Sequence, residues 1–145
     1  MNNVISFFVP GVPKPAGSKK TLPHRYTGEM VTMDMSGTAG KKWRKQVKNT
    51  AAVYWKNKLL ECPVAMNLTF YFQRPKKHFR TGKFSHLLRN DAPRHHTVTP
   101  DTTKVTRAVE DALTGVIWKD DSQVVDQHIK KRYAETPGVY VEIRW

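Results

Sequence analysis

Residues 64–72 carry the feature that most restricts the fold, because apolar side chains occupy every second position. These side chains are Val64, Met66, Leu68, Phe70 and Phe72. A period of two places all of them on one face of an extended strand, whereas a helix would scatter them around its axis. The chain must therefore build a β-sheet with one buried face, and this segment is a strand of it.

Three further segments predict strands. Residues 4–9 (VISFFV) form a short apolar run, and residues 124–133 and 139–145 flank a turn at Pro137-Gly138. In the last of them, alternate residues are apolar, as in residues 64–72. Residues 9–20 are rich in proline and lysine and predict a basic loop.

A small hairpin is expected within residues 25–33, around Thr27-Gly28, since glycine supplies the positive φ of a tight turn. Two helices are also expected. Residues 102–114 follow an amphipathic helical period, and residues 37–60 follow another, with Ser36 as N-cap and Pro63 after its end. The apolar stripe of the longer helix contains Trp43, Val47, Ala51, Tyr54 and Leu59.

The order of these elements predicts an α+β fold, with residues 1–145 as a single domain whose mixed β-sheet is covered by the two main helices. The helix at 102–114 then connects parallel strands at 64–72 and 124–133 by a right-handed crossover. Residues 74–99 show neither period and are rich in Lys, Arg and His. We interpret them as a long, mobile basic loop.

Composition excludes several classes of protein. No run approaches the roughly 18 to 20 apolar residues of a membrane span, and the N-terminus lacks the apolar core of a secretory signal. We therefore expect a cytoplasmic protein without a membrane partner. Cys62 is the only cysteine, which excludes an internal disulfide and a zinc site made of several thiolates.

Charge is distributed unevenly along the chain. The formal net charge is +13, yet residues 101–126 hold six acidic and only three basic side chains. Residues 1–100 hold 18 basic and four acidic ones. The large positive excess favours binding of a polyanion, first of all a nucleic acid. The acidic segment requires a cation or another compensation for its mutual repulsion.

Basic side chains in three regions are candidate contacts to DNA phosphates, the alternative being a merely solvated basic surface. The three regions are the proline-rich loop, the exposed face of the longer helix and the loop at 74–99. The candidates are Lys14, Lys19, Lys20, Lys41, Arg44, Lys45, Lys48, Lys76, Lys77 and Arg80.

Four aspartates are candidate ligands of Mg²⁺, or of Mn²⁺ as a substitute, because hard divalent ions prefer carboxylate oxygens. They are Asp101, Asp111, Asp120 and Asp121. Lys104 and Arg107 share a helix face with Asp111 and can neutralise charge on a phosphate in the transition state. An ion shared by Asp101 and Asp121 requires residues 115–121 to return alongside the helix. The alternative is structural, with Asp101 capping the helix and Arg107 paired to Asp111.

Aromatic and histidine residues of the 74–99 loop have two interpretations each. Phe79 and Phe84 either contact opened nucleic acid or an unpaired base, or anchor the loop to the body of the protein. His78, His86 and the pair His95-His96 are better interpreted as phosphate contacts or solvated side chains than as metal ligands, since no cysteine or helical spacing accompanies them.

The segment PDTTKVTRAVEDALTGVIWKDDSQVVD, residues 100–126, resembles the core signature of RusA-type Holliday junction resolvases, small dimeric endonucleases often carried by phages and prophages. The opening FFVPGVPKPAGSKK is similar to the N-terminal strand and loop of that family. The resemblance implies a RusA-like fold and a homodimer that resolves branched DNA, specifically four-way junctions, by paired nicking with Mg²⁺. It also implies an enzyme of recombination and repair in the bacterial host cytoplasm or nucleoid.

By position, the resemblance implies that Asp101 and Asp121 are metal ligands, that Arg107 replaces a catalytic lysine, and that Asp111 and Asp120 assist. Thr103 stands where the family pattern has a second aspartate. An alternative function is therefore a structure-selective DNA-binding protein that has lost or weakened catalysis through Thr103. A third, weaker alternative is an RNA-binding regulator.

Overall fold

The computed structural model describes residues 1–17 and 19–145. The chain divides into two compact units, each assembled from separate segments. The sheet unit comprises Met1–Pro13, Cys62–Thr99 and Val124–Trp145, and the helix unit comprises Lys14–Glu61 and Pro100–Gln123. The fold class is α+β, as expected, and the organisation as a single domain stays a prediction.

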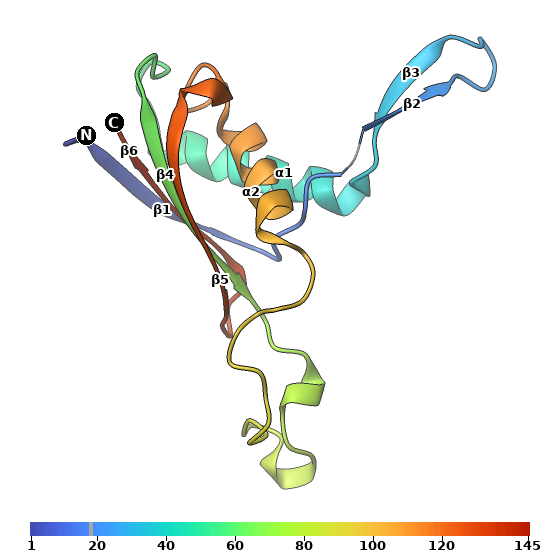
Figure 1. The fold of residues 1–145 in the computed structure, drawn as a ribbon, viewed down its shortest axis with the longest axis vertical. Helices are drawn as coiled ribbons and strands as arrows, with labels where there is room; N and C mark the ends of the chain where they lie inside the picture. The colour runs from blue at the N-terminus through green and yellow to red at the C-terminus, as the bar shows by residue number, and fades with distance from the viewer. Residues whose placement is uncertain (18) are drawn as a thin grey trace. The chain divides into compact units, whose positions relative to one another are not determined.

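The sheet unit contains a four-stranded sheet with the order β1-β6-β4-β5 (Figure 1). Its strands are β1 (Val4–Pro10), β4 (Val64–Phe72), β5 (Val124–Tyr133) and β6 (Gly138–Arg144). β4 runs parallel to β5 and antiparallel to β6, and β1 is antiparallel to β6. The mixed sheet and the parallel pair predicted from the sequence are therefore confirmed.

In β4 and β6, the buried side chains are the apolar ones that occupy alternate positions in the sequence. Val64, Met66, Leu68 and Phe70 are at most 1% exposed, and Val139, Val141 and Ile143 of β6 are fully buried. β5 lies at an edge of the sheet, where its largely exposed polar and charged side chains disfavour pairing with another strand.

Gly138, at the start of β6, is required by close packing. A Cβ at this position would lie 2.5 Å from the backbone oxygen of Val9 and would overlap the ring of Phe8. The Pro137-Gly138 turn thus allows β6 to enter the sheet directly beside β1.

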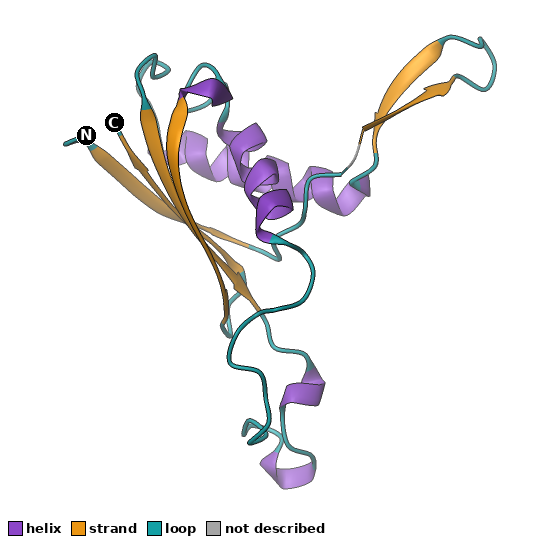
Figure 2. Cartoon of the chain, viewed as in Figure 1, coloured by secondary structure: helices purple, strands orange, loops and turns teal. Residues whose placement is uncertain are grey.

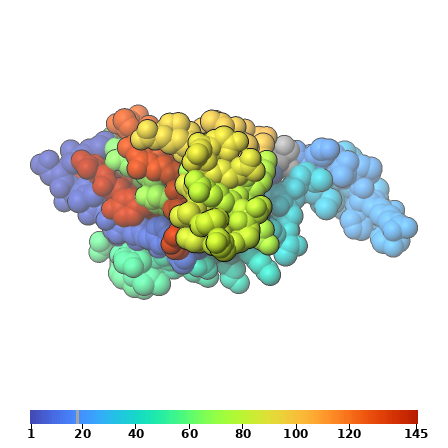
Figure 3. Space-filling model, turned by 90° about the horizontal axis from the view of Figure 1, so that it is seen from below, coloured from blue at the N-terminus to red at the C-terminus, as the bar shows by residue number. Residues whose placement is uncertain are grey.

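The 74–99 loop has defined structure. It contains the 3-10 turns η1 (Lys76–His78) and η2 (Gly82–Phe84) and an antiparallel bridge between Phe79 and Leu88. Figure 3 shows the yellow-green residues of this loop as one continuous surface facing the viewer. Internal hydrogen bonds and aromatic contacts, which leave no periodic trace in the sequence, account for this order.

The helix unit contains α1 (Gly37–Tyr54), α2 (Thr102–Leu113), the 3-10 turn η3 (Asp121–Gln123) and a two-stranded ribbon, visible in Figure 2 as the pair of orange strands joined by a teal turn. The ribbon strands are β2 (Lys19–Pro23) and β3 (Met30–Asp34). Gly28 has a φ of 70° in the connecting turn, as the sequence indicated. The predicted range 25–33 was too short, since β2 lies wholly before it and β3 ends one residue after it.

α1 ends six residues earlier than predicted. Its buried side chains follow a spacing of four, Trp43, Val47 and Ala51, and Trp55 continues the row at the C-cap. Tyr54 is 55% exposed, so its expected place in the core was wrong. The backbone of Trp55 is extended, which ends the helix well before Pro63.

α2 buries Val105, Ala108, Val109, Ala112 and Leu113 on one face, as its period predicted, and contacts α1. The opposite face is polar and carries the candidate catalytic residues. No helix in the described part of the chain is both long and apolar enough to cross a membrane.

Candidate active site on helix α2 and the following turn

Asp101 occupies the N-cap of α2. Its backbone is extended, and its Oδ1 accepts a hydrogen bond of 2.9 Å from the backbone N–H of Lys104. This satisfies one of the free donors of the first helical turn. The second oxygen, Oδ2, lies 4.0 Å from the Lys104 Nζ. The capping role considered for Asp101 is thus observed, and both side chains remain exposed to solvent.

Lys104, Arg107 and Asp111 follow each other at intervals of three and four along α2, which places them on one polar face. Among the described residues, no ion pair within 4.0 Å joins Arg107 to Asp111, although the guanidinium is close enough to act on that carboxyl and lower its pKa. The expected structural pairing of these two residues is therefore replaced by a looser arrangement, in which Asp111 faces several charges.

Asp111 has a pKa raised above its ordinary value. Partial burial of the carboxyl is the largest cause, and the carboxylate of Asp121 raises the pKa further. The cations of Lys19, Arg44 and Arg107 act in the opposite direction. Asp111 and Asp121 are thus close enough to repel each other, and a cation bound between them would remove this repulsion.

The turn after α2 is held by Trp118, which is fully buried. Its indole Nε1 donates a 2.9 Å hydrogen bond to Thr114 Oγ1, and that hydroxyl donates to the carbonyl of Glu110. The backbone N–H of Gly115 donates to the carbonyl of Trp118 at 2.7 Å. Residues 114–118 therefore form a tight turn at the C-terminal end of the helix.

Gln123 closes the next turn, which presents Asp120 and Asp121. Its Oε1 accepts hydrogen bonds from the backbone N–H groups of Lys119 and Asp120, at 3.0 and 2.8 Å, and its Nε2 donates to the carbonyl of Leu60 at 2.8 Å. No role was predicted for Gln123. Its position two residues after Asp121, within the segment 100–126 that resembles the family signature, was the signal that could have indicated one.

Asp120 has a pKa held below its ordinary value by hydrogen bonds from the side chain and backbone of Ser122. The backbone N–H of Ser122 donates to Asp120 Oδ1 at 2.8 Å. Asp120 therefore stays ionised beside Asp121, and the turn presents two adjacent, exposed carboxylates.

Asp121 is near enough to Asp111 to raise the pKa of that carboxyl, whereas Asp101 caps the opposite end of α2. α2 separates Asp101 from Asp111 by ten residues, about 15 Å along the axis at 1.5 Å per residue. Residues 115–118 turn back on Thr114 and pair with Leu60, so they do not return alongside the helix. Figure 1 accordingly shows the start of α2 and the turn before β5 at opposite ends of the helix. Within the described residues, no three His, Cys, Asp or Glu side chains form a cluster able to hold a metal ion.

Two of the predicted DNA-binding residues also have acidic neighbours within the helix unit. Arg44 is half-buried; its Nη2 lies 2.6 Å from Asp34 Oδ2, and its Nη1 donates to Ser36 Oγ. Arg44 thus ties the end of β3 to α1. Lys19 is exposed and close enough to Asp111 to lower its pKa.

The other predicted contacts remain available to DNA. Lys14 is half-buried, and the following are exposed: Lys20, Lys41, Lys45, Lys48, Lys76, Lys77 and Arg80.

A strongly basic surface and exposed carboxylates at a helix end are features found in proteins that act on nucleic acid phosphates. Residues 10–144 match the sequence profile of the family described as Endodeoxyribonuclease RusA. The chain therefore belongs to the RusA endodeoxyribonuclease family, which places it among the Holliday junction resolvases.

A known protein is also similar to this chain over most of its length. The chain is 35% identical over 111 residues to the uncharacterized protein YqaN of Bacillus subtilis strain 168, an alignment that covers 76% of this chain and 78% of that protein.

Proposed function

We propose that this chain is a Mg²⁺-dependent endodeoxyribonuclease that resolves four-way DNA junctions by paired nicks, with Mn²⁺ as a possible substitute and recombination or repair as its setting. The observation that carries the proposal is the proximity of Asp111 and Asp121. Two carboxylates close enough to repel each other, one of them with a raised pKa, are a donor set suited to a hard divalent ion.

The proposed residues have distinct roles. Asp121 and Asp101 are the principal ligands, with Asp111 and Asp120 assisting, and Gln123 and Trp118 hold the turn that presents the acidic pair. The bound ion would supply Lewis-acid activation of a phosphodiester. Arg107 and Lys104, on the exposed face of α2, would stabilise the negative charge that develops on the phosphate.

The placement of the two proposed principal ligands supports a homodimer. Since Asp101 and Asp121 lie at opposite ends of α2, one chain does not offer both to a single ion. A two-fold dimer can combine Asp121 of one copy with Asp101 of the other, which creates two equivalent sites for two cuts. This arrangement also suits the two-fold symmetry of a four-way junction.

Cleavage of a defined junction tests the proposal. A labelled four-way junction incubated with the protein and Mg²⁺ or Mn²⁺ should yield symmetric paired cuts. The Asp121→Asn variant should retain junction binding and lose cleavage. Failure of the wild-type protein to cut any branched or duplex DNA with either ion contradicts the proposal.

A second candidate function is structure-selective DNA binding without turnover. Thr103 contributes no charge at the position of the missing aspartate, and the described residues contain no cluster of three metal ligands. Calorimetric titration with Mn²⁺ separates the two functions. Salt-sensitive junction binding without carboxylate-dependent Mn²⁺ binding favours the non-catalytic function.

We further propose that the protein acts in the bacterial cytoplasm or nucleoid, where its junction substrate is found, and that it comes from a phage or prophage.

A further inference from the structure

The 74–99 loop is fixed to the sheet unit by aromatic contacts. The ring of His96 stacks on Phe72 at 4.2 Å, and the ring of His78 meets Tyr133 edge-on at 5.3 Å. Both histidines are less than 10% exposed, so their interpretation as solvated side chains or phosphate contacts was wrong. The loop is therefore anchored at two points beside the ends of β4 and β5.

Hydrogen bonds fold the tip of the loop back on itself. The backbone N–H of Arg80 donates to the carbonyl of Leu87 at 2.8 Å, and that of Arg89 donates to the carbonyl of His78 at 2.9 Å. Arg74 donates to the carbonyl of Pro93 at 2.6 Å and places its guanidinium 4.4 Å from the centre of the Tyr133 ring. The folded loop thus packs against the side chain of Tyr133 and forms one wall of the space beside it.

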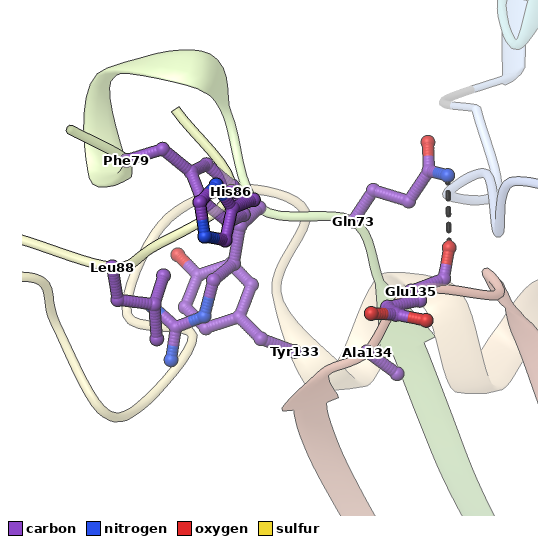
Figure 4. Close-up of a pocket in the computed structure, with 8 residues that line it drawn as sticks. Gln73, Phe79, His86, Leu88, Tyr133, Ala134 and Glu135 are labelled. Carbon is purple, nitrogen blue, oxygen red and sulfur yellow. Dashed lines mark hydrogen bonds between the residues drawn. The ribbon is translucent and has the colours of Figure 1, made fainter. Parts of the chain in front are cut away.

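A cavity of about 560 Å³ lies between this wall and the strand ends, within the size range of sites for small ligands. Figure 4 shows Phe79, His86 and Leu88 on the loop side of the cavity. Gln73 and Glu135 lie on the strand side, where Gln73 Nε2 donates to the Glu135 carbonyl at 2.9 Å.

The lining combines two kinds of chemistry. Phe79, His86 and Tyr133 offer ring faces or edges on which a planar group can stack. The carboxylate of Glu135 and the amide of Gln73 offer polar atoms to hydrogen-bonding groups at the edge of such a ring. Arg74 also lines the cavity, but its guanidinium already donates to the Pro93 carbonyl and lies over the Tyr133 ring. The aromatic residues therefore favour a flat heterocycle.

The charge around the cavity indicates where this heterocycle comes from. Residues 74–99 hold seven Lys or Arg side chains and one acidic residue, Asp91. Lys76, Lys77 and Lys83 are exposed on this loop. A surface of this charge attracts the phosphates on either side of a nucleotide whose base enters the cavity.

We propose that this cavity binds a single unpaired nucleobase of the DNA substrate, extruded at or near the branch point of a junction. A base still in a pair is blocked by its partner, so the cavity selects for opened structure rather than for sequence. The inference deepens the proposed function, since it assigns recognition of branched DNA to a site distinct from the carboxylates on α2 and η3.

The test uses the full-length protein and junctions in which one thymine beside the branch point is replaced by 5-iodouracil. Irradiation in the presence of Ca²⁺, without cleavage, joins this base to an aromatic side chain within contact distance, and mass spectrometry locates the attachment. We expect attachment to Phe79, His86 or Tyr133. Attachment confined to other residues, or none when the junction is bound, contradicts the proposal.

Affinity measurements provide a second readout. The His86→Ala variant removes an exposed ring from the lining, and Leu87→Ala is the matched control, since Leu87 is exposed in the same loop and does not line the cavity. Because stacking of a base on a ring contributes on the order of a factor of ten to affinity, His86→Ala should weaken binding of a junction with an unpaired base roughly five- to tenfold. It should leave binding of paired duplex unchanged.

The two proposals fail in different ways. If the wild-type protein cuts junctions normally but His86→Ala loses no preference for unpaired bases, the base-binding cavity is wrong and the nuclease function stands. If the protein crosslinks through the cavity and binds junctions without cutting them, the nuclease function is wrong and the base-binding cavity stands. An equal loss of affinity for duplex and junction in His86→Ala also contradicts the cavity.

Discussion

Asp101 and Asp121 lie at opposite ends of α2, with Asp101 at the N-cap and Asp121 in the turn beyond the C-terminus. The hydrogen bond that the Lys104 N–H donates to Asp101 and the tight turn of residues 114–118 fix this separation. The metal site proposed for these two carboxylates therefore combines one carboxylate from each of two copies of the chain.

Subunit complementation should therefore restore cleavage. Asp101→Asn and Asp121→Asn homodimers should each lose at least about 100-fold in rate, as enzymes do when a charge-stabilising group is removed. A mixed dimer of the two variants keeps one complete site and should make single nicks. Co-expression with two affinity tags isolates the mixed dimer. If the mixed dimer is as inactive as its parents, both carboxylates act within one chain.

Restoring a carboxylate at position 103 should strengthen metal binding. Thr103 is exposed in the first turn of α2, two residues after Asp101, so Thr103→Asp adds charge without disturbing the core. We expect Mn²⁺ affinity to rise on the order of tenfold, or about 1.4 kcal/mol. Calorimetry measures the change, and Thr102→Asp is the control at the neighbouring exposed position. If the Thr103→Asp and wild-type proteins bind Mn²⁺ with equal affinity, the metal does not bind beside the N-terminal end of α2.

Removing the side chain of Gln123 should impair cleavage through the geometry of the turn. Gln123→Ala loses hydrogen bonds to Lys119, Asp120 and Leu60. At roughly 0.5–1.5 kcal/mol each, the loss of stability is about 1.5–4.5 kcal/mol. A positioning role predicts a lower kcat with junction affinity retained. Gln46→Ala, an exposed change on α1, is the control. A change in affinity alone would contradict this role.

Acid should destabilise the anchored loop. Burial lowers the pKa of His78 and of His96, with the cations of Arg74 and Lys77 acting on His78 and that of Lys131 on His96. The folded state therefore binds these protons less well than the unfolded state, and the stability from the neutral rings is complete above about pH 6.5 and declines as the pH falls below it.

Melting temperatures measured between pH 8 and pH 5 test this dependence. The wild-type protein should lose stability towards pH 5, and the doubly substituted His78→Phe, His96→Phe protein should show a flatter profile. His86→Phe, at an exposed position in the same loop, is the control. Equal slopes in all three proteins would show that other groups titrate.

Local patterns predicted most of the elements, while the site depended on contacts between distant residues. The alternation in residues 64–72 predicted β4 with its observed bounds, because a half-buried strand has a strict period of two. The helical period predicted α1 but placed Tyr54 in the apolar stripe. In the structure, buried residues occur every fourth position from Trp43, and the last of them is Trp55. Burial of His78 and His96 depends on Phe72 and Tyr133, far apart in the chain, and no local pattern reports it.

Basic residues of the loop should set the salt dependence of DNA binding. Lys76, Lys77 and Arg80 are exposed, and each phosphate neutralised contributes about −0.9 to the slope of log affinity against log salt concentration. Lys76→Ala, Lys77→Ala should therefore make the slope less steep by roughly 1.8 if both contact phosphates. Lys56→Ala, Lys58→Ala removes the same charge from an exposed segment beyond α1 and controls for the change in net charge. Fluorescence anisotropy at several salt concentrations measures the slopes. Because general attraction depends on total charge and direct contacts depend on position, equal effects of the two double variants would contradict phosphate contact by this loop.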